Sequence, residues 1–226
     1  MTTAKDLFII AMDPRPERSV GQGDLSLALA GAELIDLIDA GTVTVDEDRI
    51  VPGEPSPPQD RLLGEAAEQL TRGESPHERI EDWLWRRGRD LAAAYQAALE
   101  EDGELTRKRS GRLSFGSERV EPVDTPARRA AAERWEEREP VLAALASAVG
   151  VEGGRPKGAE TAEEAESAEQ AESAEDSNDF GEEPGLDDEA VTAVVTAVHD
   201  AVMELEAVRQ RRTIENSAFA NLWRGP

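Results

Sequence analysis

Several residue types that carry chemistry are scarce in this chain. It has no cysteine, two histidines and 4% aromatic residues among 226. The absence of cysteine excludes disulfides, thiolate zinc sites and a cysteine nucleophile, and it fits a reducing compartment. His77 lies beside an expected helix start and His199 among valines, and no HExxH, GxSxG or glycine-rich phosphate loop accompanies them. We therefore expect no catalytic site, no metal site and no cofactor.

Long apolar runs are also missing. No window approaches the roughly 20 apolar residues of a membrane span, and the apolar stretch Leu7 to Met12 is too short for a signal peptide. The sequence therefore predicts a cytoplasmic protein. Any contact with a membrane would be peripheral, at its inner face.

Basic residues are fewer than acidic ones, 25 against 49, so the net charge is -24. The excess is concentrated between Gly158 and Glu189, which hold 14 acidic residues and no basic one. Residues 152–186 bury too little apolar surface to offset the entropy of ordering, which predicts a disordered acidic insert. A transient single helix is the alternative, because alanine and glutamate favour helices. Residues 1–151 and 187–226 would then form one domain.

Helical spacing of apolar residues dominates the rest of the chain and predicts a mainly α fold. Residues 43–51 and 105–123 instead show strand and turn patterns typical of two small β-hairpins. The sequence thus predicts a single compact helical domain with two hairpins. We expect a helix or strand at 4–12 and helices at 25–41, 62–70, 75–102, 125–139, 142–149 and 189–210, with Asp24 or Ser26, Ser75, Thr125 and Asp187 or Asp188 as caps and Gly41 and Gly103 as ends.

Three stretches resemble the Golgi phosphoprotein 3 family: TTAKDLFIIAMD, LSLALAGAELIDLIDAGTVTVDEDRI, and the stretch from WLWRRGRD to RRAAAERW. The resemblance covers residues 4–150 and 187–223. It implies a non-enzymatic peripheral membrane adaptor, because members of the family bind phosphatidylinositol 4-phosphate in a basic pocket and recruit other proteins. The excess of arginine, 22 against three lysines, resembles a bacterial member.

The resemblance also implies where a lipid headgroup would bind. Gly21 and Ala30 stand at the positions of the family's pocket tryptophan and first arginine, and neither has the side chain that the family uses there. Its remaining arginines fall near Arg86, Arg87 and Arg89, and guanidinium groups form paired hydrogen bonds with phosphate. We predict these three arginines as the headgroup site. The alternative is a solvated helix face, and for Trp83 and Trp85 nearby we favour a core position over a membrane interface.

The second hairpin is cationic and includes one aromatic residue near its turn: Arg107, Lys108, Arg109, Arg112 and Phe115. This pattern suits an anionic membrane surface, and the family resemblance adds contact with a protein partner or a second copy. The alternative is a charged hairpin that resists edge pairing. A protein-interaction scaffold without lipid binding stays open as a function. So does a winged-helix-like nucleic-acid-binding module, which the net charge opposes.

Overall fold

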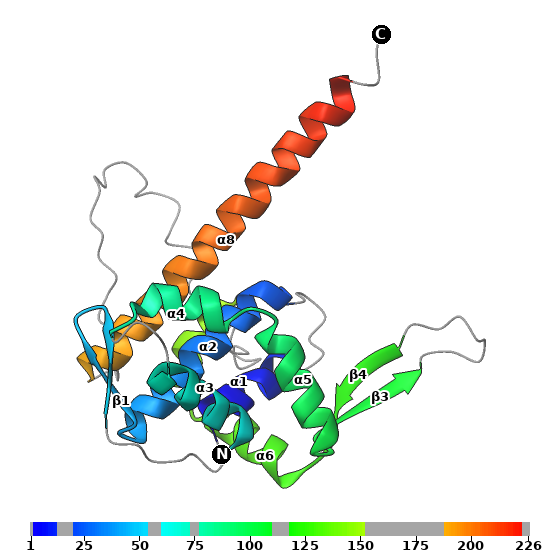
Figure 1. The fold of residues 1–226 in the computed structure, drawn as a ribbon. Helices are drawn as coiled ribbons and strands as arrows, with labels where there is room; N and C mark the ends of the chain where they lie inside the picture. The colour runs from blue at the N-terminus through cyan, green and yellow to red at the C-terminus, as the bar shows by residue number, and fades with distance from the viewer. Residues whose placement is uncertain are drawn as a thin grey trace, which may run out of the picture.

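The computed structural model describes residues 2–12, 20–53, 60–72, 77–109, 118–151 and 188–222, without the side chains of 71–72, 108–109, 118–119 and 216–222. These residues form a mainly helical fold with two separate two-stranded antiparallel sheets, as predicted (Figure 1). The elements are α1 (Thr3–Ala11), α2 (Gln22–Asp39), β1 (Val43–Asp46), β2 (Arg49–Pro52), α3 (Arg61–Arg72), α4 (Ile80–Arg87), α5 (Leu91–Glu101), β3 (Leu105–Arg109), β4 (Glu118–Pro122), α6 (Pro126–Glu136), α7 (Pro140–Ala148) and α8 (Glu189–Leu222). The acidic insert lies outside the described residues.

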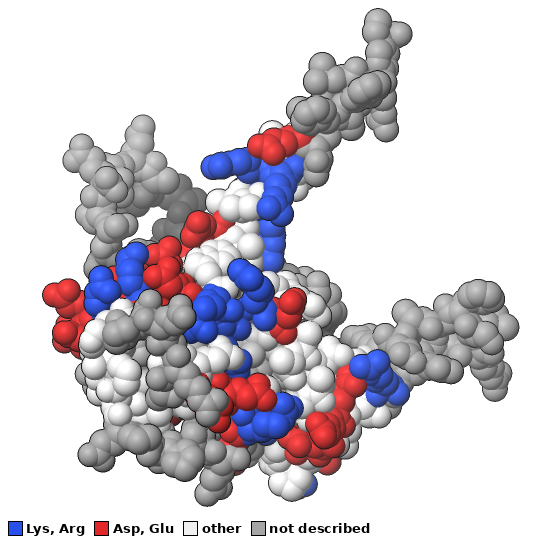
Figure 2. Space-filling model, viewed as in Figure 1, with Lys and Arg blue, Asp and Glu red and all other residues white. Residues whose placement is uncertain are grey.

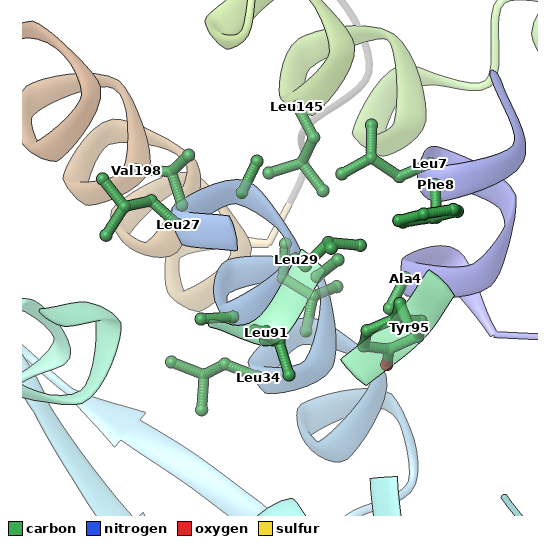
Figure 3. Packing of buried hydrophobic residues seen from close by; sticks show 14 of the residues in the cluster. Ala4, Leu7, Phe8, Leu27, Leu29, Leu34, Leu91, Tyr95, Leu145 and Val198 are labelled. Carbon is green, nitrogen blue, oxygen red and sulfur yellow. The ribbon is translucent and has the colours of Figure 1, made fainter. Parts of the chain in front are cut away.

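Helix α2 is the centre of the core. Its sequence is apolar on nearly every face, as expected for a helix that other helices surround, and Leu29 and Leu34 are fully buried. Figure 3 shows side chains of α1, α5, α7 and α8 converging on it. Close approach to α8 depends on Gly31, where a Cβ atom would lie 2.3 Å from Val198. The helix ends before Gly41, whose φ of 67° suits glycine.

Helix α1 is attached to α2 by a carboxylate. Asp36 accepts hydrogen bonds from the backbone N–H groups of Thr3 and Ala4, at 2.9 and 3.2 Å. These groups belong to the first turn of α1, where no intrahelical acceptor exists. Burial raises the pKa of Asp36 from the ordinary 3.8 to about 6, although the two N–H donors oppose the shift. The carboxylate thus holds α1 in place at an electrostatic cost.

This raised pKa has a measurable effect on stability. The folded protein binds a proton at Asp36 more tightly than the unfolded chain does, so stability falls as the pH rises from about 4 to about 6. We expect Asp36→Asn, which resembles the neutral form, to be more stable than the wild type by about 1–3 kcal/mol near pH 7.5. Near pH 4.5 the two proteins should match. Urea unfolding at both pH values tests this, and a difference that is the same at both would contradict it.

The expected helix over residues 75–102 is interrupted at both its start and its middle. Arg79 is extended and pairs with Arg49 of β2, with Ile50 N–H donating to the Glu78 carbonyl and Ile80 N–H to that of Asp48. These strand-like bonds replace the first helical turn, so α4 begins at Ile80. The predicted helix start at residue 75 is therefore wrong: Ser75 lies outside the described residues, and the cap of α4 is Arg79, because pairing with β2 outweighs the local helix signal.

Helix α8 returns the chain to α2 after the acidic segment. Asp188 accepts a hydrogen bond from Ala190 N–H at 2.8 Å, as predicted for a cap. Val191, Val194 and Val198 are buried against the body. Beyond them the helix leaves the body and projects outward (Figure 1). Within the described ranges, none of the helices has the length and hydrophobicity of a membrane span.

Candidate functional site

The predicted headgroup arginines lie around a sharp turn between α4 and α5. Gly88 caps α4, and a Cβ atom there would lie 2.5 Å from the Leu84 carbonyl and 3.2 Å from that of Ser26. Only glycine allows the turn to approach α2 so closely. The Ser26 hydroxyl then accepts a hydrogen bond from Ala92 N–H at 3.0 Å. Ser26 is therefore not the cap of α2 that the sequence suggested: it binds the first turn of α5.

Arg87 points into the protein. Its guanidinium donates to both carboxylate oxygens of Glu33, at 2.7 and 2.8 Å, and to the Leu62 carbonyl at 3.0 Å. The hydroxyl of Tyr95 donates to the same carboxylate at 3.1 Å. Burial alone would lower the pKa of Arg87, but the bonds and charge of Glu33 raise it above its ordinary value. Arg87 thus joins α4, α2 and α3 and is turned away from any headgroup.

Arg86 lies at the surface with much of its hydrogen-bonding capacity used. Two of its nitrogens donate to the carboxylate of Glu78, at 2.8 and 2.6 Å, and the third donates to Gln69 at 3.1 Å. Its guanidinium carbon also lies 5.1 Å from the ring centre of Trp83. Trp83 itself is fully buried, as favoured above, and its indole N–H donates to the Ala30 carbonyl at 3.1 Å.

Of the three arginines, Arg89 at the α4–α5 turn has the guanidinium group most accessible to a ligand. It is exposed and forms no ion pair with any residue that the structure describes. A guanidinium without a carboxylate partner retains all five donors for a ligand. Figure 2 shows Lys and Arg side chains gathered near the end of α4 and along the projecting part of α8.

A fourth arginine, Arg209 of α8, lies against the first turn of α2. Both carboxylate oxygens of Asp24 are 2.7 Å from Nη1 of Arg209. The cap of α2 is Gly21, so the prediction of Asp24 as the cap is wrong: its carboxylate turns to Arg209 instead. A Cβ atom on Gly21 would lie 3.4 Å from Arg209, and one on Gly23 2.9 Å from it. The position expected for the family's tryptophan therefore borders an arginine.

The second hairpin is confirmed by β3 and β4, which pair from Leu105–Pro122 to Arg109–Glu118 and project from the body (Figure 1). Arg107 donates to Glu100 of α5 at 2.8 Å. Lys108 and Arg109 lie in β3 with side chains outside the description, and Arg112 and Phe115 lie outside the described residues altogether. The membrane or partner role of this hairpin remains a prediction.

A comparison with protein families decides the relationship. The family model of Golgi phosphoprotein 3 (GPP34) matches residues 4–205. The chain belongs to the Golgi phosphoprotein 3 family. This family is known for phosphoinositide binding and is not a family of enzymes. A search of curated proteins finds no match. In the part of the chain that the structure describes, no group of three or more metal-ligating side chains is present.

Two important residues were not found from the sequence. Glu33 reads as one polar position on an apolar helix, and nothing local indicates that it pairs with Arg87, 54 positions away. Arg209 and Asp24 are 185 positions apart. A buried glutamate on an otherwise apolar helix face is the one signal that suggests a paired cation.

Proposed function

We propose that this member of the Golgi phosphoprotein 3 family is a peripheral membrane adaptor that binds a phosphatidylinositol 4-phosphate type headgroup, acting at the inner face of the membrane and without enzymatic activity. Arg89 is the main contact for the phosphate, and Arg86 lies beside it. Arg87 contributes indirectly, because its bonds to Glu33 hold the α4–α5 turn. The observation that carries the proposal is the exposed, unpaired guanidinium of Arg89 on a turn anchored to α2.

The cationic hairpin would approach the same membrane or a neighbouring molecule. Arg107 at its base and the four further predicted residues, Lys108, Arg109, Arg112 and Phe115, supply charge and one apolar ring. A juxtamembrane basic residue contributes about 1 kcal/mol at an anionic surface. In this proposal the hairpin strengthens attachment without selecting the lipid. A second copy of the chain is the other partner it could take.

Charge reversal at Arg89 tests the headgroup site. With vesicles of phosphatidylcholine containing about 5 mol% phosphatidylinositol 4-phosphate, we expect Arg89→Glu to lower binding about tenfold or more, the loss expected for a charged hydrogen bond. Vesicle flotation measures this. A short-chain soluble form of the lipid should compete for the wild type.

Arg138→Glu is the matched control, because Arg138 is exposed at the α6–α7 turn and the change in charge is the same. Its binding should remain near that of the wild type. Equal binding by Arg89→Glu and Arg138→Glu would refute the site, and binding that does not depend on phosphatidylinositol 4-phosphate would refute the lipid.

A groove of about 440 Å³ favours a second candidate, a protein-interaction scaffold. It is bounded by the β1–β2 turn, the start of α4 and one face of α8. Its uncharged lining is mostly alanine, and its charged lining consists of five carboxylates and one arginine: Glu47, Asp48, Glu81, Asp200, Glu204 and Arg79. That arginine already pairs with Asp48 and Glu81, at 2.6 and 3.3 Å. The groove is therefore acidic and would suit a basic segment of a partner protein. This role would remain if phosphoinositide had no effect on vesicle binding.

A further inference from the structure

Helix α8 continues well beyond the segment that the family shares. The family match ends at residue 205, whereas the helix runs to Leu222. The buried residues described in α8 end at Ala201, which is 3% exposed, and the helix then projects from the body (Figure 1). The extension is therefore a feature of this chain that the family relationship does not explain.

One side of the extension is turned toward the body. Arg209 binds Asp24 at 2.7 Å, and a Cβ atom on Gly23 would lie 2.9 Å from Leu205, so this side of α8 rests on the first turn of α2. Because each residue turns a helix by about 100°, Arg212 lies on the same side as Arg209. The opposite side of α8 is consequently turned outward.

The outward side carries a short, mostly apolar stripe. Residues three or four positions apart lie on one face of a helix, and the described members here are Met203, Ala207, Gln210 and Ile214. All four are exposed, Met203 by 60% and Ile214 by 67%. A helix without tertiary contacts is only marginally stable in water, so a surface that covers this stripe would stabilise the extension.

Two opposite charges flank the stripe on one edge. Glu204 follows Met203, Arg211 follows Gln210, and the side chains of Glu204 and Arg211 are exposed. They are two helical turns apart, about 10 Å along the axis, which is too far for an ion pair within one helix. Neither forms an ion pair with any residue in the described ranges, the neighbouring Glu215 included. The edge is therefore of mixed charge, acidic near the body and basic farther out.

Such an edge is complementary to itself when two helices run in opposite directions. With a twofold axis between residues 208 and 209, Met203 lies opposite Ile214 of the second copy, and Ala207 lies opposite its Gln210. Glu204 then comes alongside Arg211 of the second copy, and the symmetry forms each of these contacts twice. A single polar residue in such a seam, here Gln210, lowers stability but helps to fix the register.

Parallel pairing suits the charges less well. It would place two chains, each of net charge -24, at the same end of the helix pair, whereas antiparallel pairing places the two bodies at opposite ends. It would also bring Arg211 to Glu206 rather than to Glu204. Glu206 already accepts a hydrogen bond from Gln210 at 3.1 Å and lies 3.6 Å from Arg209.

We propose that α8 binds α8 of a second copy in antiparallel orientation through residues 203–214, forming a weak symmetrical dimer. Pairing of Glu204 with Arg211 determines the direction, and burial of Met203 and Ile214 provides most of the stabilisation. A contact of this length is small, so the dimer is reversible and depends on concentration. The inference does not depend on Arg89, on a lipid or on the second hairpin.

The absence of cysteine from this chain allows a direct test of the direction. Met203→Cys and Ile214→Cys are prepared as separate full-length variants, one of them tagged, and are then mixed and oxidised in a glutathione redox buffer. Antiparallel pairing places the two introduced thiols opposite each other, whereas the same position in the two copies is separated by about 16 Å. A disulfide needs much closer Cα atoms, so we expect mixed dimers to exceed the homodimers of either variant by about fivefold or more.

A mixture of Arg129→Cys with Arg138→Cys is the matched control, because both positions are exposed, on α6 and on the turn that follows it. Its crosslinking measures random collisions. Mixed dimers of the α8 variants that are no more abundant than the dimers of this control would overturn the proposal. An excess of Met203→Cys homodimers would indicate parallel pairing and would overturn it as well.

Charge reversal tests the complementarity by sedimentation equilibrium of the full chain without lipid. Glu204→Arg and Arg211→Glu should each raise the dimer dissociation constant about tenfold, because each replaces two attractive pairs by two repulsive ones. The double variant restores both pairs with the charges exchanged, so it should dimerise nearly as the wild type does. Arg138→Glu changes the net charge as Arg211→Glu does and should have no effect.

Two results of this experiment would overturn the proposal, whatever the outcome of the vesicle experiments. One is a wild type that stays monomeric up to about 1 mM. The other is a double variant that dimerises more weakly than either single variant, because the two charges would then not contact each other across the dimer.

Discussion

Arg87→Ala is expected to destabilise the protein by about 3–5 kcal/mol, the usual consequence of removing one partner of a buried ion pair. Arg87 is 7% exposed in its side chain and Glu33 is fully buried. Without the guanidinium, the Glu33 carboxylate would keep only the hydroxyl of Tyr95 as a donor among the contacts described above. The desolvation that was offset by Arg87 would then oppose folding. Urea unfolding followed by circular dichroism at neutral pH measures the change.

The adjacent arginine provides a control on the same helix. Arg86→Ala removes the same charge from α4, but its side chain is 43% exposed and its ion pair is solvated. Exposed pairs contribute about 0–1 kcal/mol, so the loss of stability in Arg86→Ala should be small.

Acidification provides a further check. The unpaired Glu33 of Arg87→Ala should take up a proton more readily, so its loss of stability relative to the wild type should be smaller near pH 5. Similar losses in both variants would contradict a buried, charged pair.

Trp83→Ala should lower the free energy of unfolding by a similar amount, about 3–5 kcal/mol, as other truncations of buried aromatic residues do. The indole is fully buried and fills the space where α4 meets α2. Its removal leaves a cavity and leaves the Ala30 carbonyl without this donor. It also removes the ring beneath Arg86, so the proposed lipid binding at the α4–α5 turn should weaken along with stability. Chemical denaturation and flotation of the same variant test both effects.

Two substitutions separate the causes of that loss. Trp83→Phe retains most of the apolar volume and loses the N–H donor, so about 1–3 kcal/mol is expected from the unsatisfied carbonyl and the smaller ring. Trp85→Ala removes the same side chain from a partly buried position two residues along α4. Its cost should be clearly lower than that of Trp83→Ala. If Trp85→Ala were the more damaging variant, the assignment of Trp83 to the core would be wrong.

The three predicted headgroup arginines show how far local patterns can predict the surroundings of a side chain. The run Trp83 to Arg89 indicated a cationic helix end, but three arginines within four positions have three different surroundings. Arg87 is buried with Glu33, Arg86 pairs with Glu78, and Arg89 is exposed. Helical geometry alone separates their directions by about 100° per residue. Which direction faces the core depends on where α2 and α3 pack.

Most of the order of elements was determined by the sequence itself, because apolar periodicity, prolines at Pro126 and Pro140, and Gly41 act on the backbone within a few residues. The division of residues 75–102 into α4 and α5 was not predicted. The tertiary structure alone decided three things: the start of α4 at Ile80, the pairing of Glu33 with Arg87, and the contact of Arg209 with Asp24. Each depends on groups that are distant in sequence. Burying an unpaired charge opposes folding, so a buried charge pairs with whichever distant group the packing brings next to it. Local sequence cannot specify these contacts, since the free energy that favours each of them arises only when the helices pack together.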